Sequence, residues 1–187
     1  MSLNQENVRV AVTGAVYAGT SSAVLPTSAD ESPSGFTDLG YVGEDGVTET
    51  RDRSTDTLKA WQNAAVVRTL VTEGTITYQC VLLETKRETI EEYYFAPVAS
   101  DGSVVIDPTT EAPRKPYVID VIDGDDFIRA VIGSGAVTDI GDQVYASGEA
   151  IGYDVTITAY QGTYGETGSE WTGSVKKFYS SLADPEV

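Results

Sequence analysis

Alternation of apolar and polar positions dominates this chain and predicts β-strands. In "NVRVAVTGAVYAG", residues 7 to 19, Val8, Val10 and Val12 alternate with polar or small residues. This predicts a half-buried first strand that ends at Gly19. A long strand with the same alternation is predicted in "AIGYDVTITAYQG", residues 150 to 162, through Tyr153, Val155, Ile157 and Ala159.

Two apolar runs in the middle of the chain predict an antiparallel hairpin. The runs are "AAVVRTLV", residues 64 to 71, and "GTITYQCVLLE", residues 74 to 84, and "TEG" joins them. Glycine is typical of hairpin turns, so Gly74 is expected in the turn. In the second run every other residue is apolar, which places a buried face at Ile76, Tyr78, Cys80 and Leu82.

The next stretch, "LETKRETIEEYYF", interrupts the strand pattern and predicts a short helix over about residues 85 to 95. Thr85 and Glu88 match a capping box, in which a Thr side chain and a Glu three residues later satisfy the first backbone N–H groups. Leu83, Ile90 and Tyr94 lie at helical spacing and form an apolar stripe. A strand through Thr89, Glu91, Tyr93 and Phe95 is the alternative.

The remaining segments complete an all-antiparallel pattern. "SDGSVVID" predicts a turn and a short strand near residues 103 to 107, and "YVIDVIDGDDFIRAVI" predicts two strands joined at "DGDD". Residues 20 to 35 and 162 to 173 are rich in turn residues, and "SVKKFYSSL" is a candidate last strand. We therefore expect one mostly β domain over residues 1–187, an antiparallel β-sandwich or barrel of about eight strands with one flanking α-helix.

Charge narrows the classes of function. The chain carries 12 Lys and Arg against 29 Asp and Glu, a formal net charge of −17. Residues 1 to 115 hold 17 acids and 9 bases and residues 116 to 187 hold 12 and 3, so the charge is not an acidic tail. Such a surface either keeps the protein soluble or repels a polyanion. The second interpretation argues against sequence-specific nucleic-acid binding.

The sequence offers little for catalysis. There is no His, and Cys80 is the only Cys, which excludes Ser-His-Asp and Cys-His nucleophilic sites and any intramolecular disulfide. The acidic turns at Asp45 and Asp123 lack the ligand spacing of an EF-hand loop, which leaves only weak calcium binding open. We expect no enzymatic activity, cofactor or metal. No signal peptide or apolar run of membrane-spanning length is found, so we expect a soluble chain made in the cytoplasm.

The stretch "YVGEDGVTETRDRSTDTLKAW", residues 41 to 61, is the unusual one. Its Thr residues favour a strand, yet charges occupy positions on both sides of that strand. A ribbon that is polar on both faces cannot be held by its own core. We interpret it as an arm that is either mobile in the free subunit or ordered by pairing with another chain.

The order of these features resembles the major tail tube proteins of long-tailed (siphovirus-type) bacteriophages. The resemblance rests on "YVGEDGVTE", on the "KAWQ" that follows the arm, and on the strand leading into "LLETKRETIEEYY". It covers nearly the whole chain. The resemblance implies a virion structural protein whose subunits form hexameric rings that stack into a tube, through which DNA passes without specific binding.

The same resemblance implies which residues matter. It places contacts between subunits in the arm at about residues 43 to 57, with the termini as secondary candidates; the arm candidates are Glu44, Asp45, Glu49, Arg51, Asp52 and Arg53. An acidic channel would keep DNA from sticking, and the candidates for its lining are Asp120, Asp123, Asp125 and Asp154. The implied partners are other copies of the chain and the tape measure, tail terminator and distal tail proteins.

The chain ends at "SSLADPEV", so no appended immunoglobulin-like domain is expected. The competing hypotheses are a β-sandwich module that binds a glycan or a protein through exposed Tyr and Trp, and a related tail-associated or injection-device tube protein. Formation of rings or tubes by the purified protein separates the first of these from a tube subunit.

Overall fold

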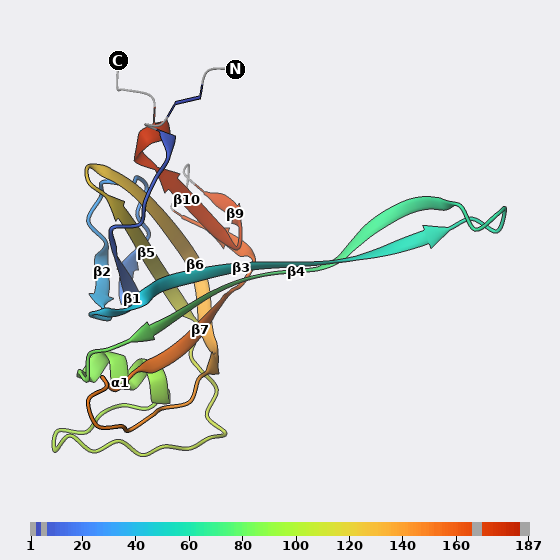
Figure 1. The fold of residues 1–187 in the computed structure, drawn as a ribbon. Helices are drawn as coiled ribbons and strands as arrows, with labels where there is room; N and C mark the ends of the chain where they lie inside the picture. Colours follow the sequence, from blue (N-terminus) through green and yellow to red (C-terminus); the bar gives the residue numbers. More distant parts are fainter. Residues whose placement is uncertain (1–2, 5–6, 166–169, 184–187) are drawn as a thin grey trace.

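The computed structural model describes residues 3–4, 7–165 and 170–183, and β-strands make up most of it (Figure 1). One α-helix, α1 (Arg87–Tyr94), and a 3-10 turn, η2 (Ser180–Leu182), accompany ten strands in this described part. The strands are β1 (Thr13–Val24), β2 (Ser34–Asp38), β3 (Val42–Lys59), β4 (Val66–Leu82), β5 (Lys115–Asp123), β6 (Asp126–Ile140), β7 (Tyr153–Ala159), β8 (Gly162–Tyr164), β9 (Trp171–Gly173) and β10 (Val175–Tyr179). The expected class, mostly β with one helix, is confirmed.

A single antiparallel sheet supplies both layers of the sandwich. Its strand order is β2-β1-β5-β6-β7-β4-β3, and β10 pairs with β6; β8 and β9 form a separate small hairpin. Strand β6 changes partners along its length, because its first half lies between β5 and β10 whereas Gly135 to Ile140 pair with β7. The sheet thereby turns at β6 and closes over a core to which both halves contribute, among them Val16 and Ile119 from one half and Cys80 and Val155 from the other.

Alternation predicted the two central strands correctly. In β7 the four positions Tyr153, Val155, Ile157 and Ala159 are buried and the residues between them are partly exposed. Tyr78, Cys80 and Leu82 of β4 face the same core. The hairpin of β5 and β6, with its turn at Gly124 and Asp125, also has the predicted form.

The first strand differs from the prediction. It begins at Thr13 and not at residue 7, and it continues past Gly19 to Val24. Val8, Val10 and Val12, expected to be half-buried, are 62 to 70% exposed. The reason is the length of the partner strand, since Thr13 pairs with Ile122 and β5 ends one residue later. The segment before Thr13 therefore extends beyond the strand that would cover it.

The hairpin predicted around Gly74 is wrong. Residues 66 to 82 form one continuous strand, β4, in which Gly74 lies opposite Arg53 of β3. The residues from 66 to 76 pair with β3 instead of folding back on the rest of β4, and the actual turn lies at residues 61 to 64. Since β3 finds its backbone partner within its own chain, it does not need another chain to become a strand.

Helix α1 lies where a helix was expected but begins differently. The capping box is wrong, because the Thr85 hydroxyl lies 2.9 Å from the Tyr153 hydroxyl, and Lys86 is the N-cap residue with no side-chain cap. The helix ends at Tyr94, and the next residue, Phe95, caps it with a left-handed φ of 56°. Buried Glu92 fixes the helix to β5, where it accepts a hydrogen bond from the Tyr117 hydroxyl at 2.5 Å and pairs with Lys115.

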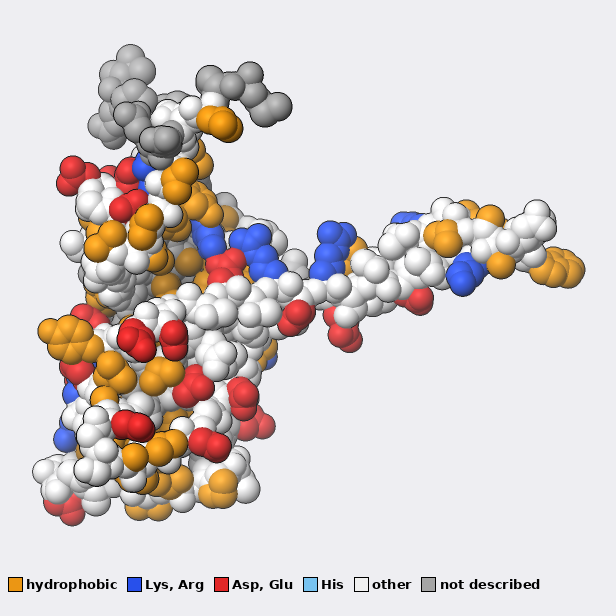
Figure 2. All heavy atoms as spheres, viewed as in Figure 1, with side chains coloured by type: hydrophobic (Ala, Val, Ile, Leu, Met, Phe, Trp, Pro, Cys, Tyr) orange, Lys and Arg blue, Asp and Glu red, His pale blue; other side chains and the backbone are white. Residues whose placement is uncertain are grey.

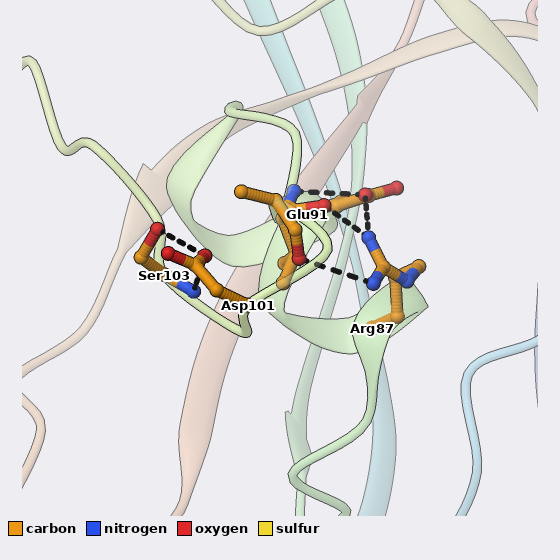
Figure 3. A network of polar contacts seen from close by, with 6 residues as sticks. Arg87, Glu91, Asp101 and Ser103 are labelled. Atoms are coloured by element: carbon orange, nitrogen blue, oxygen red, sulfur yellow. Dashed lines mark hydrogen bonds and ion pairs between the residues drawn. The ribbon is translucent and has the colours of Figure 1, made fainter.

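The segment after α1 is a long loop and not the strand predicted near residues 103 to 107, although the turn at Gly102 is present. Arg87 of α1 donates hydrogen bonds to the carbonyl oxygens of Val98 and Ala99 (Figure 3). Glu91 accepts one from the backbone N–H of Val98 at 3.0 Å. These contacts satisfy loop backbone groups that a strand would have paired with a neighbour. Within the described residues, no helix has the length and apolarity needed to cross a membrane.

Candidate functional site: the β3–β4 arm and its root

The outer halves of β3 and β4 form a two-stranded arm that projects far from the rest of the molecule (Figure 1). We define the arm as residues 51–75 and the remainder of the chain as the body. Every arm residue is exposed except Ala60, which is partly exposed. At the tip, Asn63 and Ala64 both have positive φ, as in the tight turns that join twisted antiparallel strands.

The arm carries apolar side chains with no cover. Trp61 at the tip is 98% exposed, and Leu58, Val66, Val67, Leu70 and Val71 are also exposed. Two-stranded ribbons are marginally stable in water, and exposed apolar patches are typical of interaction surfaces. The geometry of the arm therefore suits docking on another macromolecule.

The root of the arm is fixed to the body by Glu49. Its carboxylate pairs with Lys177 of β10 and accepts a hydrogen bond from Arg51 Nε at 2.7 Å. Partial burial by itself would raise the pKa of Glu49, but the hydrogen bonds from Lys177 and Arg51 outweigh it and lower this pKa from its ordinary value. Glu49 is thus a charged link between the body and the start of the arm.

A bulge precedes this link. Val42 pairs with Leu82 and Val47 with Cys80, so residues 43 to 46 have no paired partners and Gly46 takes a φ of 66°. The bulge exposes Glu44 and Asp45, which line an open cleft of about 870 Å³ together with Gln79, Val81 and Asp154. The six arm candidates from the sequence thus fall into three places: the bulge, the root at Glu49, and the start of the arm proper.

The four acids considered for a channel lining lie in different environments. Asp120 is buried and forms a two-point ion pair with Arg129, which also donates to the carbonyl oxygens of Ser28 and Glu31 in the loop after β1. Asp123 accepts a hydrogen bond from the backbone N–H of Val10, and Asp125 is exposed in the β5–β6 turn. Asp154 is partly exposed and accepts hydrogen bonds from Gln79.

Asp154 belongs to a polar sheet face that the sequence did not single out. Pairing places Thr48 and Thr50 of β3 beside Gln79 and Thr77 of β4, and these beside Thr156 and Thr158 of β7. Asp139 of β6 pairs with Thr156 on the same face. We call these residues, with Asp154, the threonine face. It contains no Lys or Arg.

Two observations on the described residues bear on possible chemistry. Burial raises the pKa of Cys80 to about 12, which makes its thiol a poor nucleophile. No group of three or more His, Cys, Asp or Glu side chains in the described part is arranged to hold a metal ion. The features that stand out are an exposed arm, a polar sheet face and a large acidic surface.

A family model decides between an assembly subunit and a binding module. The model, described as phage tail tube protein, matches residues 1–178 of the 187. The chain belongs to the phage tail tube protein family. This tail tube protein is therefore a structural component of the phage virion tail, and it assembles with copies of itself and with other tail proteins. No curated protein matches the chain.

The arm residues chosen from the sequence end at Arg53, so the second strand of the arm and its tip were missed. Leu58, Trp61, Lys59, Arg68 and Leu70 were not chosen. A signal was present in "VVRTLV", where Arg68 interrupts an apolar run that would otherwise suit a buried strand. It was assigned to a hairpin that packs on the body.

Proposed function

We propose that six copies of this tail tube protein form a ring, that rings stack into a hollow tube, and that genomic DNA passes through it without specific binding. The arm is the observation that carries this proposal. It extends the sheet of one subunit well beyond that subunit's own core, so its exposed apolar residues require a surface on another copy. An arm on one copy and a receiving surface on the next make a heterologous contact, the kind that closes rings or propagates filaments.

The ends of the body support stacking of one ring on the next. The segment before β1 and the turn η2 after β10 lie at one end, and α1 with the loop after it lies at the opposite end (Figure 1). Exposed apolar side chains occur both in the N-terminal segment, at Val8, Val10 and Val12, and in the segments near α1, at Val105, Tyr145 and Ile151. Two different apolar ends are suited to head-to-tail stacking.

The threonine face is the best candidate for the channel lining. A channel for DNA must avoid Lys and Arg, because each cation that neutralises a phosphate adds to the affinity. The threonine face has hydroxyl groups and the carboxylates Asp139 and Asp154, and Thr138 and Thr158 share a hydrogen bond at its edge. Among the four sequence candidates, Asp154 lies on this face, whereas Asp120 is neutralised by Arg129.

The remaining expectations follow from the same role. We propose that the tube contacts the tape measure protein inside and the tail terminator and distal tail proteins at its ends. We further propose that the subunit has no enzymatic activity and is made in the host cytoplasm before assembly.

Shortening the arm tests the proposal. Arg51 and Ile76 are direct partners, so residues 52–75 can be replaced by Asn-Gly to give a short hairpin without disturbing the body. We expect this variant to melt cooperatively but to form no rings or tubes in negative-stain electron microscopy at concentrations where the wild type does. Thr69→Ser, a small change on the same arm, is the matched control. A wild-type protein that stays monomeric and binds glycans would overturn the proposed function.

A further inference from the structure

The two faces of the arm carry opposite charge. Residues that pair directly across antiparallel strands lie on the same face, and alternate residues of a strand share a face. Arg51, Arg53 and Lys59 therefore lie on one face, which we call the basic face. Ile76 is the partner of Arg51 and Val66 that of Lys59, and Val71, the partner of Thr55, lies on the same face. Asp52, Asp56 and Glu73 lie on the other, the acidic face, which also carries Leu58 and Leu70. Figure 2 shows blue side chains along one side of the arm and red ones along the other.

Pairing within the arm does not account for this separation. Arg51 pairs with Glu49 at the root, but the ion pairs among the described residues include neither Arg53 nor Lys59, nor any of the three acids of the acidic face. Arg68, on the acidic face near the tip, is the exception to the pattern. Like charges that are neighbours on one face destabilise an isolated ribbon. The arrangement is therefore suited to a ribbon with different surroundings on its two sides.

Continuity of the sheet says what each side faces at the root. The basic face continues the side of β3 and β4 that covers the core, through Val47, Tyr78 and Cys80. The acidic face continues the threonine face, through Thr50, Thr77 and Gln79. Beyond the body, the basic face no longer has the core of its own subunit to pack on and needs another surface. The acidic face remains turned to solvent, as the threonine face is.

The charge of the body supplies a complementary surface. The arm holds 4 Lys and Arg and 3 Asp and Glu, a net charge of +1, which leaves 8 basic and 26 acidic residues, net −18, in the body. Bodies of this charge repel one another, and a basic ribbon laid across a neighbouring body offsets that repulsion.

We propose that each arm lays its basic face, with Val66 and Val71 on that face, on the body of another copy, while its acidic face continues the channel lining of the threonine face. This inference rests on the proposed tube. It assigns Arg51, Arg53 and Lys59 to docking and adds Asp52, Asp56 and Glu73 to the surface that faces DNA.

Two matched triple reversals test the assignment. In R51E/R53E/K59E the docking face becomes acidic, so we expect a folded subunit whose critical concentration for assembly rises by at least about tenfold. In D52K/D56K/E73K the docking face is intact, and we expect tubes to form as in the wild type. These tubes should retain a short DNA duplex at low ionic strength and release it at high ionic strength, because lysines in the channel bind phosphates.

The outcomes separate this inference from the proposed function. A wild-type protein that forms no tubes removes the proposed function itself, and with it the basis for docking. If wild-type tubes form but R51E/R53E/K59E assembles equally well, docking through the basic face is wrong. If D52K/D56K/E73K fails to assemble, or its tubes bind no more DNA than wild-type tubes, the acidic face does not line the channel. The neutral variant R51Q/R53Q/K59Q controls for misfolding of the charge-reversed variant. It removes the attraction between the basic face and an acidic body without adding repulsion, so its critical concentration should lie between those of the wild type and R51E/R53E/K59E.

Discussion

The Asp120 carboxylate and the Arg129 guanidinium face each other across β5 and β6, with both of their hydrogen bonds at 2.6 Å. They are direct strand partners, and both are nearly fully buried. Hydrogen bonding to Asp120 raises the pKa of Arg129, against the effect of burial. Because Arg129 also holds the loop after β1, this pair belongs to the architecture of the subunit and not to its charged surface.

We expect Asp120→Asn to destabilise the subunit by about 3–5 kcal/mol, because it leaves a buried guanidinium without its counter-charge. The measurement is urea denaturation of the unassembled protein. Asp125→Asn in the exposed β5–β6 turn is the control, with an expected change within about 0.5 kcal/mol. Equal unfolding midpoints for the two variants would contradict the structural role of Asp120.

The alternation of apolar and polar residues predicted a strand well where the body supplies a paired strand on each side of it. The alternation in β7 matched its burial residue by residue, since β4 and β6 flank it. The same pattern at Val8, Val10 and Val12 indicated an apolar face but not what covers it, and the partner strand ends too early. Alternation shows which residues share a face of a strand. Whether that face is buried depends on how far the neighbouring strands extend.

The sequence pattern also does not show which strands pair with one another. The sequence around Gly74 fits a hairpin turn as well as the interior of an exposed two-stranded ribbon. The hairpin was therefore predicted some ten residues from the true turn at residues 61 to 64. Within the candidate site, a period of two already separates Arg51 and Arg53 from Asp52. Adding Lys59 and Glu73 to these faces requires the pairing of β3 with β4 and its register shifts.

Glu49 predicts a pH-dependent contribution to stability at the root of the arm. Its folded-state pKa lies below the ordinary 4.5, so its stabilising effect is complete above 4.5 and is lost as the pH falls through the folded value. We expect Glu49→Gln to cost about 1 kcal/mol near pH 7 and less near pH 3, because protonation weakens the ionic contacts of Glu49. Denaturant titrations at both pH values measure the difference. Glu44→Gln, in the exposed bulge, should change little at either pH, and a pH-independent cost for Glu49→Gln would exclude the ionic link.

The Cys80 thiol should report global unfolding. Burial raises its pKa from 9.0 to about 12, which lowers the thiolate fraction near pH 8 on the order of 1,000-fold, and the core also blocks access. We expect a disulfide reagent to label native protein far more slowly than urea-unfolded protein. The positional control is Cys80→Ala combined with Ser100→Cys in the exposed loop, which should react quickly in the native state. Rapid native labelling of Cys80 would show that β4 opens locally.

Trp61 predicts how the tip of the arm behaves on assembly. Its side chain is 98% exposed in the subunit, so Trp61→Ala should leave subunit stability unchanged within about 0.5 kcal/mol. If the tip docks on another copy, loss of a buried Trp anchor should raise the critical concentration for tubes by about 30-fold, which corresponds to about 2 kcal/mol. Fluorescence gives a direct readout, because Trp61 should move from water into an apolar contact and its emission should shift to shorter wavelength. Trp171→Phe removes the other Trp of the chain as a background for this experiment. Tubes that form with unchanged Trp61 emission would show that the tip stays in solvent and that only the ribbon of the arm docks.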